Sequence, residues 1–185
     1  DTLEAYTTDS LDNRAIIDRV LTPAWTVYAG HRLQLTRLRN VTQEAVVPET
    51  IPGNSFISAG EGGAAMNTSD DPYYPTRGSQ LIFAYEHASQ YLLSDLQYAR
   101  GVAEGRHYFQ LIGQVVLALR LRLGAALPTE DTAEVPIFKR FFTGGATTVR
   151  GYGFQQLGAL DAAGRPIGGV SLTEGNFEVR FPVWG

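Results

Sequence analysis

The chain has 185 residues and a net charge of −4, so it is long enough for one large domain and lacks the basic excess usual in nucleic-acid-binding proteins. It holds no cysteine, which excludes disulfides, thiol nucleophiles and cysteine-ligated zinc. No apolar run approaches the ~20 residues of a membrane-spanning helix, and residues 1–4 lack the basic start of a signal peptide. A transmembrane β-barrel stays compatible with these absences, because its apolar residues occupy only alternate positions.

Alternation of apolar and polar residues, which is the pattern of a strand, recurs along the chain and predicts an all-β fold. It is clear over residues 25–39, where Leu33 and Leu35 fall on one face while Arg32 and Gln34 fall on the other. Eight strands are predicted in all, at residues 3–8, 14–20, 25–39, 55–68, 78–87, 90–103, 106–124 and 169–183.

The last two of these segments carry the strongest pattern. Residues 106–124 alternate for longer than the usual strand of about 5–6 residues, which fits a membrane strand extended into solvent. In residues 169–183, one face collects polar side chains and the other collects Phe177, Val179 and Phe181. The polar set is Glu174, Asn176, Glu178 and Arg180. We therefore expect a wet lumen on one side of the sheet and lipid on the other.

The predicted connections alternate in length. Residues 21–23 and 101–105 are short, whereas residues 41–52 and 127–167 are long. Short turns on one rim and long loops on the other are typical of outer-membrane barrels. No repeat or linker divides the chain, so residues 1–185 are predicted to form one partial antiparallel transmembrane β-barrel domain.

The long loop at 127–167 is the most informative segment, because long loops in compact domains are uncommon and usually functional. Its central residues combine glycines, aromatics and one arginine, with no group suited to catalysis: Phe142, Gly144, Gly145, Val149, Arg150, Gly151 and Tyr152. A loop that folds back into a barrel lumen would place Arg150 against a wall carboxylate, and Glu178 and Glu174 lie on the polar face of the next strand.

Enzyme chemistry is not expected. The histidines, His31, His87 and His107, lack the spacing of metal ligands, and neither a phosphate loop nor a nucleophile elbow is present. The sequence therefore indicates no catalytic residue, cofactor or metal. The aromatics Trp25, Tyr73, Tyr74, Tyr98 and Trp184 are compatible with the interfacial girdles of a barrel or with the core of a soluble β-sandwich.

Residues 140–152, RFFTGGATTVRGY, resemble the signature loop of the outer-membrane assembly-factor superfamily, which includes BamA, TamA and the two-partner secretion transporters. Further matches are the DP…PTRG pattern at residues 71–78 and GGVSL…EVRFP at residues 168–182. The resemblance implies that Arg150 reaches into the lumen and contacts an acidic wall residue, which is Glu178 by motif, with Glu174 as the alternative.

The resemblance also implies a sixteen-stranded barrel behind periplasmic repeat domains, of which this chain would supply the fifth to the twelfth strand. A partial barrel of this kind would not close on itself and would leave two open edges. The implied function is outer-membrane protein assembly, insertion or translocation of TamA or BamA type, in the outer membrane of a Gram-negative-type bacterium. The alternatives are a two-partner secretion transporter and a passive pore or surface-antigen barrel.

The partners implied are outer-membrane lipid, unfolded client outer-membrane or secreted proteins, and periplasmic or inner-membrane assembly partners. Nucleic acid is not among them, in agreement with the acidic balance of the chain.

Overall fold

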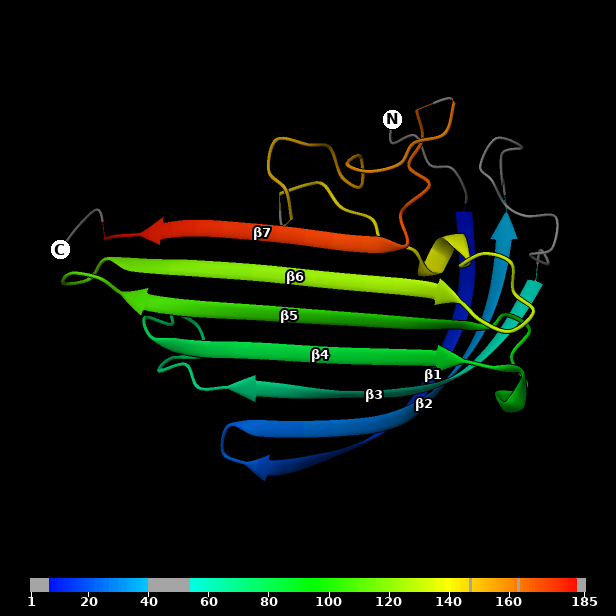
Figure 1. The fold of residues 1–185 in the computed structure, drawn as a ribbon, viewed down its shortest axis with the longest axis horizontal. Helices are drawn as coiled ribbons and strands as arrows, with labels where there is room; N and C mark the ends of the chain where they lie inside the picture. Colours follow the sequence, from blue (N-terminus) through cyan, green and yellow to red (C-terminus); the bar gives the residue numbers. More distant parts are fainter. Residues whose placement is uncertain (1–6, 40–53, 147, 163, 183–185) are drawn as a thin grey trace.

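A computed structural model describes residues 7–39, 54–146, 148–162 and 164–182, which form a single antiparallel sheet (Figure 1). Seven strands follow one another in chain order across this sheet, each hydrogen-bonded to the next. They are β1 (Thr7–Thr22), β2 (Trp25–Arg39), β3 (Asn54–Asn67), β4 (Gly78–Ala88), β5 (Tyr98–Gln110), β6 (Val116–Pro128) and β7 (Ser171–Arg180). Among the described residues β1 and β7 form the two edges, so the sheet is open.

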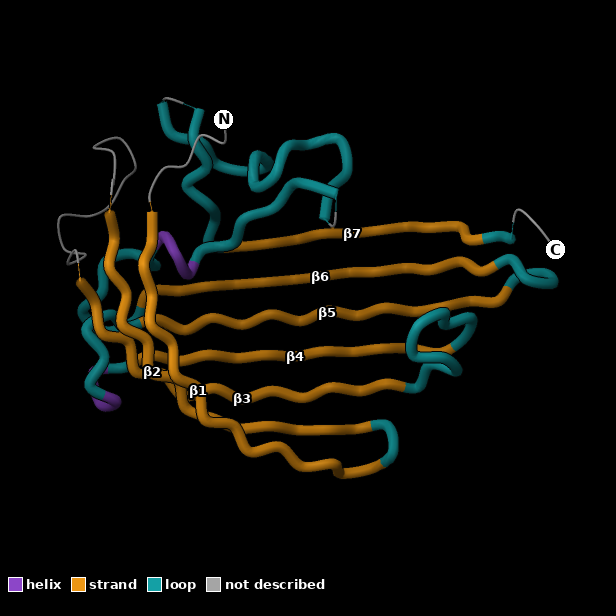
Figure 2. Tube along the Cα trace, turned by 180° about the vertical axis from the view of Figure 1, so that it is seen from behind, coloured by secondary structure: helices purple, strands orange, loops and turns teal. Residues whose placement is uncertain are grey.

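The sheet is strongly curved. In Figure 1, β4 to β7 run side by side across the view, whereas β1 to β3 bend and sweep toward the side on which the long loop lies. Figure 2 shows the same bend from behind, with helix confined to two short 3-10 turns. No helix in the described residues is long and apolar enough to cross a membrane.

The all-β prediction is confirmed, but the prediction of eight strands is wrong for the part of the chain that the structure describes, which forms seven. Residues 14–20 and the end of the predicted strand at 3–8 belong to one strand, β1, because polar residues such as Asp12 stay in register with β2. Asp12 lies opposite Gln34 and forms an ion pair with Arg32. Polarity at Asp12 therefore marks a polar position within the strand and not its end.

The predicted strand at 106–124 is in fact two strands, β5 and β6, joined by a turn at residues 111–115. In the turn, the Gln110 side chain donates to the Gly113 carbonyl at 2.8 Å, and Gly113 adopts a φ of 57°. The register pairs Phe109 with Leu117, so odd-numbered residues face the same side before and after the turn. The alternation continues through the turn without a change of phase, so the apolar and polar pattern of the sequence does not reveal the turn.

The predicted turn at 101–105 is also wrong, because Gly101 and Gly105 lie inside β5. They lie opposite Tyr85 and Leu81 of β4, and a Cβ at Gly105 would come within 3.2 Å of Leu81 Cδ2. These glycines make room for large neighbours across the strands. The strand predicted from residue 90 begins only at Tyr98, after a 3-10 turn.

The two faces of the sheet differ in chemistry. The outer face, defined by apolar and exposed side chains, includes Leu119, Leu121, Leu123, Phe177 and Val179. The inner face, defined by charged side chains on the alternate residues, includes Glu86, Glu104, Arg120, Arg122, Glu174 and Glu178. Phe177 is 69% exposed whereas Glu174, three residues earlier on the other face, is 3% exposed. This inversion of a soluble protein's pattern suits lipid outside and a polar lumen inside.

The aromatic residues divide between these faces. Trp25 is 39% exposed, and Tyr73 and Tyr74 are exposed on the connection between β3 and β4. Of the two alternatives left open for Tyr98, the girdle position is excluded, because this side chain is fully buried on the inner face and hydrogen-bonds Glu86. Trp184 and the loop predicted at 41–52 lie outside the described residues.

Candidate functional site

The connection between β6 and β7 spans residues 129–170, against the 127–167 predicted, and it folds back on itself. Its two limbs are joined near the sheet by an antiparallel bridge between Phe141 and Gly169, with N···O distances of 2.8 and 2.9 Å. A 3-10 turn, η2 (Ile137–Lys139), precedes the bridge. Figure 1 shows the loop turning back beside β7, so that its middle returns toward the strands.

The base of the loop is held on the inner face by a small apolar cluster. The cluster comprises Val102, Ala126, Val135, Phe141 and Leu172 and joins β5, β6, β7 and the loop. A Cβ at Gly124 of β6 would lie 2.7 Å from Phe141 Cζ, so glycine leaves the space that the ring fills. The Arg100 guanidinium lies 4.5 Å from the centre of the same ring, within reach of a cation–π interaction.

The glycines of the predicted motif adopt backbone conformations that other residues disfavour. The φ angles of Gly144, Gly145 and Gly151 are 108°, 111° and 97°. At Gly144 a Cβ would also lie 2.7 Å from the carbonyl oxygen of Gly153. Glycine reaches such angles without steric cost. The motif therefore fixes the path by which the chain turns back and presents Arg150.

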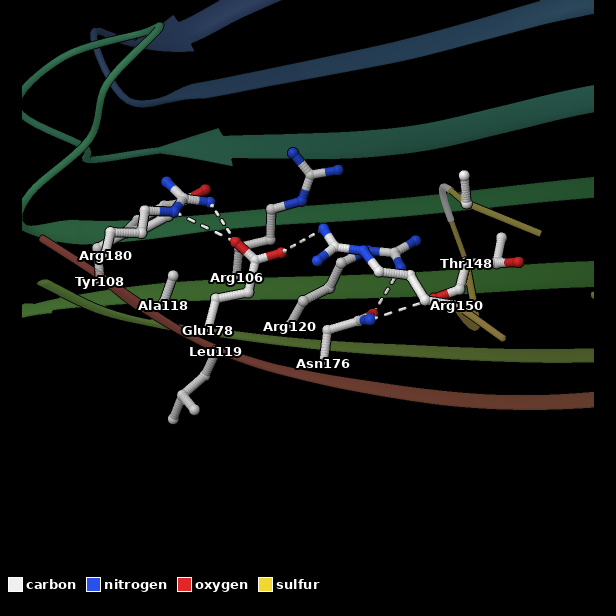
Figure 3. Close-up of a pocket in the computed structure, with 11 residues that line it drawn as sticks. Arg106, Tyr108, Ala118, Leu119, Arg120, Thr148, Arg150, Asn176, Glu178 and Arg180 are labelled. Carbon is white, nitrogen blue, oxygen red and sulfur yellow. Dashed lines mark hydrogen bonds and ion pairs between the residues drawn. The ribbon is translucent and has the colours of Figure 1, made fainter. Parts of the chain in front are cut away.

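The structure places Arg150 beside Glu178, which is the partner implied by the motif. Arg150 Nη2 lies 3.4 Å from Glu178 Oε1, and the Arg180 side chain approaches the other oxygen of the carboxylate at 3.1 Å (Figure 3). The Arg150 side chain is 79% exposed and that of Glu178 39% exposed. An ion pair this open to water contributes at most about 1 kcal/mol. The pair therefore adds little to the stability of the docked loop.

The alternative acid, Glu174, binds another part of the same loop. Its carboxylate accepts a hydrogen bond from the Thr143 hydroxyl and lies 3.7 and 3.6 Å from Arg120 and Arg122. One pleat further on, the Asn176 side chain donates to a loop carbonyl, that of Thr148, at 3.2 Å. Alternate residues of β7, from Glu174 to Glu178, thus contact successive parts of the loop.

The remaining motif residues lie around this path. Phe142 is half-buried against Gly168, where an added Cβ would come within 2.8 Å of the ring. Val149 is half-buried, whereas Tyr152 is 53% exposed. The structure therefore gives Phe142 a packing contact and leaves Tyr152 available at the surface of the described residues.

An open cavity lies between the loop and the inner face. Guanidinium groups predominate in its lining, which includes Arg106, Arg120, Arg150, Arg180, Tyr108, Asn176 and Glu178 (Figure 3). Glu104 pairs with Arg106 and Arg120 at 2.7 and 2.9 Å. The arrangement can hold negative charge and orient a loop through charge-assisted hydrogen bonds. The three histidines lie elsewhere, on β2, β4 and β5.

Sequence reasoning missed a second contact between loop and wall. The Lys139 amine of η2 lies 2.6 Å from Glu86 Oε1 of β4, and the Tyr98 hydroxyl binds the same carboxylate. Glu86 falls on the inner face by the alternation of its strand, which indicates that its carboxylate is either hydrated or paired with a cation. The sequence alone names no partner for it, because 53 residues separate it from Lys139.

Comparison with known proteins agrees with this geometry. A model of the Omp85 superfamily domain matches residues 1–185. The chain belongs to the Omp85 superfamily. The family is one of outer-membrane proteins, and the exposed apolar side chains of the outer face suit contact with lipid.

Individual relatives point the same way. The chain is 29% identical over 155 residues to the outer membrane protein assembly factor BamA of Nitratidesulfovibrio vulgaris, covering 83% of this chain and 20% of that protein. It is 30% identical over 103 residues to a SAM50-like protein of Drosophila melanogaster, covering 56% of this chain and 23% of that protein. The chain therefore spans about a fifth of the length of these relatives.

The fold is similar to that of a solved barrel. The crystal structure of BamA from Haemophilus ducreyi lacking POTRA domains 1–3 superposes with a TM-score of 0.86 at 19% identity. The match covers 94% of this chain and 37% of the other. At this identity the likeness shows the fold, which is that of part of an outer-membrane β-barrel.

Proposed function

We propose that this chain is the wall and inner loop of an outer-membrane protein assembly factor, of BamA or TamA type, that inserts or translocates client proteins. The Omp85 family match supports the assignment, as do the two relatives, an outer membrane protein assembly factor and a SAM50-like protein. The observation that carries it is the loop, whose glycine-rich motif turns back over the inner face and brings Arg150 to Glu178.

The activity proposed is non-covalent. Client strands would pair with an exposed edge of the full barrel, which supplies backbone hydrogen bonds that lipid cannot. The expected partners are therefore unfolded client proteins, outer-membrane lipid, and periplasmic or inner-membrane assembly components. In this scheme the loop braces the lumen and couples the shape of the barrel to the passage of a client, and neither a cofactor nor a catalytic residue takes part.

Charge reversal tests the loop's role in the full-length protein. Arg150→Glu should reduce the amount of folded client recovered in the outer membrane, because it places two carboxylates side by side at the contact with Glu178. Glu178→Arg in the same chain should restore part of the loss by re-forming the pair in reverse. Arg77→Glu is the matched control, since Arg77 is 72% exposed on a different connection and also faces a single carboxylate, that of Asp70, at 4.0 Å.

Normal client assembly by Arg150→Glu would contradict the proposed role of this loop. A passive pore predicts a different pattern: steady ion conductance, and unchanged client levels when the protein is deleted. A two-partner secretion transporter predicts loss of one secreted client while other outer-membrane proteins assemble normally.

A further inference from the structure

The base of the loop carries a buried amine that the motif does not include. Lys139, at the end of η2, is 6% exposed, and its partner Glu86 on β4 is 8% exposed. The amine lies 2.6 Å from Glu86 Oε1 and 5.2 Å from the centre of the Tyr98 ring. Tyr98 is itself fully buried and donates its hydroxyl to Glu86. A charged pair this well covered contrasts with the exposed pair at Arg150.

Glu86 is held in place from the wall side as well. Arg32 of β2 approaches its second oxygen at 3.6 Å and also pairs with Asp12 of β1. Arg100 of β5 donates to the Lys139 carbonyl at 3.1 Å. Lys139 therefore attaches the loop to a network that extends from β1 to β5, whereas Arg150 reaches only the edge strand β7.

Burial changes what each pair does. Two charges shielded from water interact more strongly than two exposed ones, and removal of one partner leaves the other charge uncompensated. The Arg150 pair is screened by solvent on both sides, with exposures of 79% and 39%. We infer that Lys139 is the positioning residue that keeps the loop docked on the inner face, through Glu86 and Tyr98, and that the Arg150 contact depends on it.

The chain between the two contacts is short and supported. From Lys139, the loop runs through the Phe141–Gly169 bridge and the Thr143 contact with Glu174 before it reaches Arg150. Loss of the Lys139 contact would release the apolar base at Phe141 and let the whole path move away from β7. Loss of the Arg150 contact would free only the outer turn.

Disulfide trapping measures docking directly in the full-length protein. Thr148→Cys puts one thiol on the loop and Asn176→Cys puts the other on β7, at two residues joined by the hydrogen bond from the Asn176 side chain to the Thr148 backbone carbonyl at 3.2 Å. The chain has no cysteine of its own, and any others in the full-length protein are removed. Cross-linking is started with a copper–phenanthroline oxidant, and its rate is followed by gel mobility in barrels that pass the heat-modifiability test of folding.

Lys139→Met should slow cross-linking at least threefold, whereas Arg150→Gln should change it less than twofold. Arg140→Met is the matched control, because Arg140 pairs with Glu134 of the loop itself at 2.8 Å. Glu86→Gln should slow cross-linking as Lys139→Met does, and combining the two should add little. The paired exchange Lys139→Glu with Glu86→Lys should recover part of the rate.

An unchanged rate in Lys139→Met, or a larger loss in Arg150→Gln, would overturn the inference. If Lys139→Met does not fold, Glu86→Gln decides in the same way, since it keeps the size of the side chain. Any effect of Lys139→Met on client assembly rests on the proposed function. The cross-linking rate does not, so loose docking with normal client assembly would count against the proposed function alone.

Discussion

Gly124 of β6 lies against the Phe141 ring of the loop, and Gly124→Ala perturbs that contact with a single methyl group. The added Cβ would lie 2.7 Å from Cζ and 2.8 Å from Cε1 of Phe141, and 3.2 Å from Cβ of Leu172. Ordinary contact begins at 3.4 Å, so the Phe141 ring must move by about 0.7 Å, the difference between 3.4 and 2.7 Å. The ring is enclosed by its cluster and by Arg100, which limits that movement.

The size of the effect follows from the clash. Overpacking of this kind costs about 1–3 kcal/mol. The preference of a strand for alanine over glycine does not change the docking equilibrium, because β6 is a strand whether the loop is docked or not. We expect a loss of about 1–3 kcal/mol in loop docking, which lowers the ratio of docked to undocked loop by roughly 5- to 150-fold.

Gly175→Ala provides the matched control for Gly124→Ala. Gly175 lies in the neighbouring strand β7, and a Cβ there would meet no atom within 4 Å. The assay is the cross-linking rate between Thr148→Cys and Asn176→Cys in each background. We expect slow cross-linking in Gly124→Ala and a normal rate in Gly175→Ala. Equal rates in the two backgrounds would refute the close packing of Phe141 on Gly124.

Two further predictions concern polar turns and the motif. Hydrogen bonds from the Thr76 hydroxyl and the Arg77 and Thr76 amides hold the pKa of the Asp70 carboxyl well below its usual 3.8. The ionised carboxylate therefore stabilises this turn above pH 3.8, and the stabilisation is lost as pH falls through the folded-state pKa. Asp70→Asn should therefore speed hydrogen exchange of the Thr76 and Arg77 amides at pH 7, with the difference shrinking in acid; equal protection at pH 7 would contradict this. Gly144→Ala should slow loop cross-linking, and Gly113→Ala should slow it less. Gly144 has a φ of 108° in a crowded site, whereas Gly113, at 57°, faces open space. Equal, small effects of the two substitutions would show that Gly144 is not conformationally required.

The sequence indicated the fold class because the lipid and the lumen each select one residue in two, and this pattern survives along β2, β6 and β7. It misplaced elements where the pattern carries no information. The turn at 111–115 keeps Phe109 and Leu117 in phase, so nothing in the alternation reveals it. Glycine is typical of turns, but Gly101 and Gly105 lie within β5, opposite the large side chains of Tyr85 and Leu81 on β4.

The candidate site, like the fold, could be predicted only in part from the sequence. The phase of β7 left Glu178 and Glu174 as partners for Arg150, the family resemblance of the motif favoured Glu178, and Arg150 and Glu178 lie 3.4 Å apart. Lys139 and Glu86 could not be paired from sequence, because their contact depends on how η2 settles against the curved wall. The curvature is a property of the whole sheet, whereas alternation describes one strand at a time.

The charged inner face has a consequence for how neighbouring strands find their alignment. A slip of one residue would turn apolar side chains inward, but a slip of two keeps every apolar residue toward lipid and is not penalised there. Between β4 and β5 a charge pair resolves that ambiguity: Glu86 lies directly opposite Arg100, and a slip of two would set it opposite Tyr98 or Val102 instead. The charges on the inner face thus select one register between neighbouring strands, which the contact of the outer face with lipid does not do.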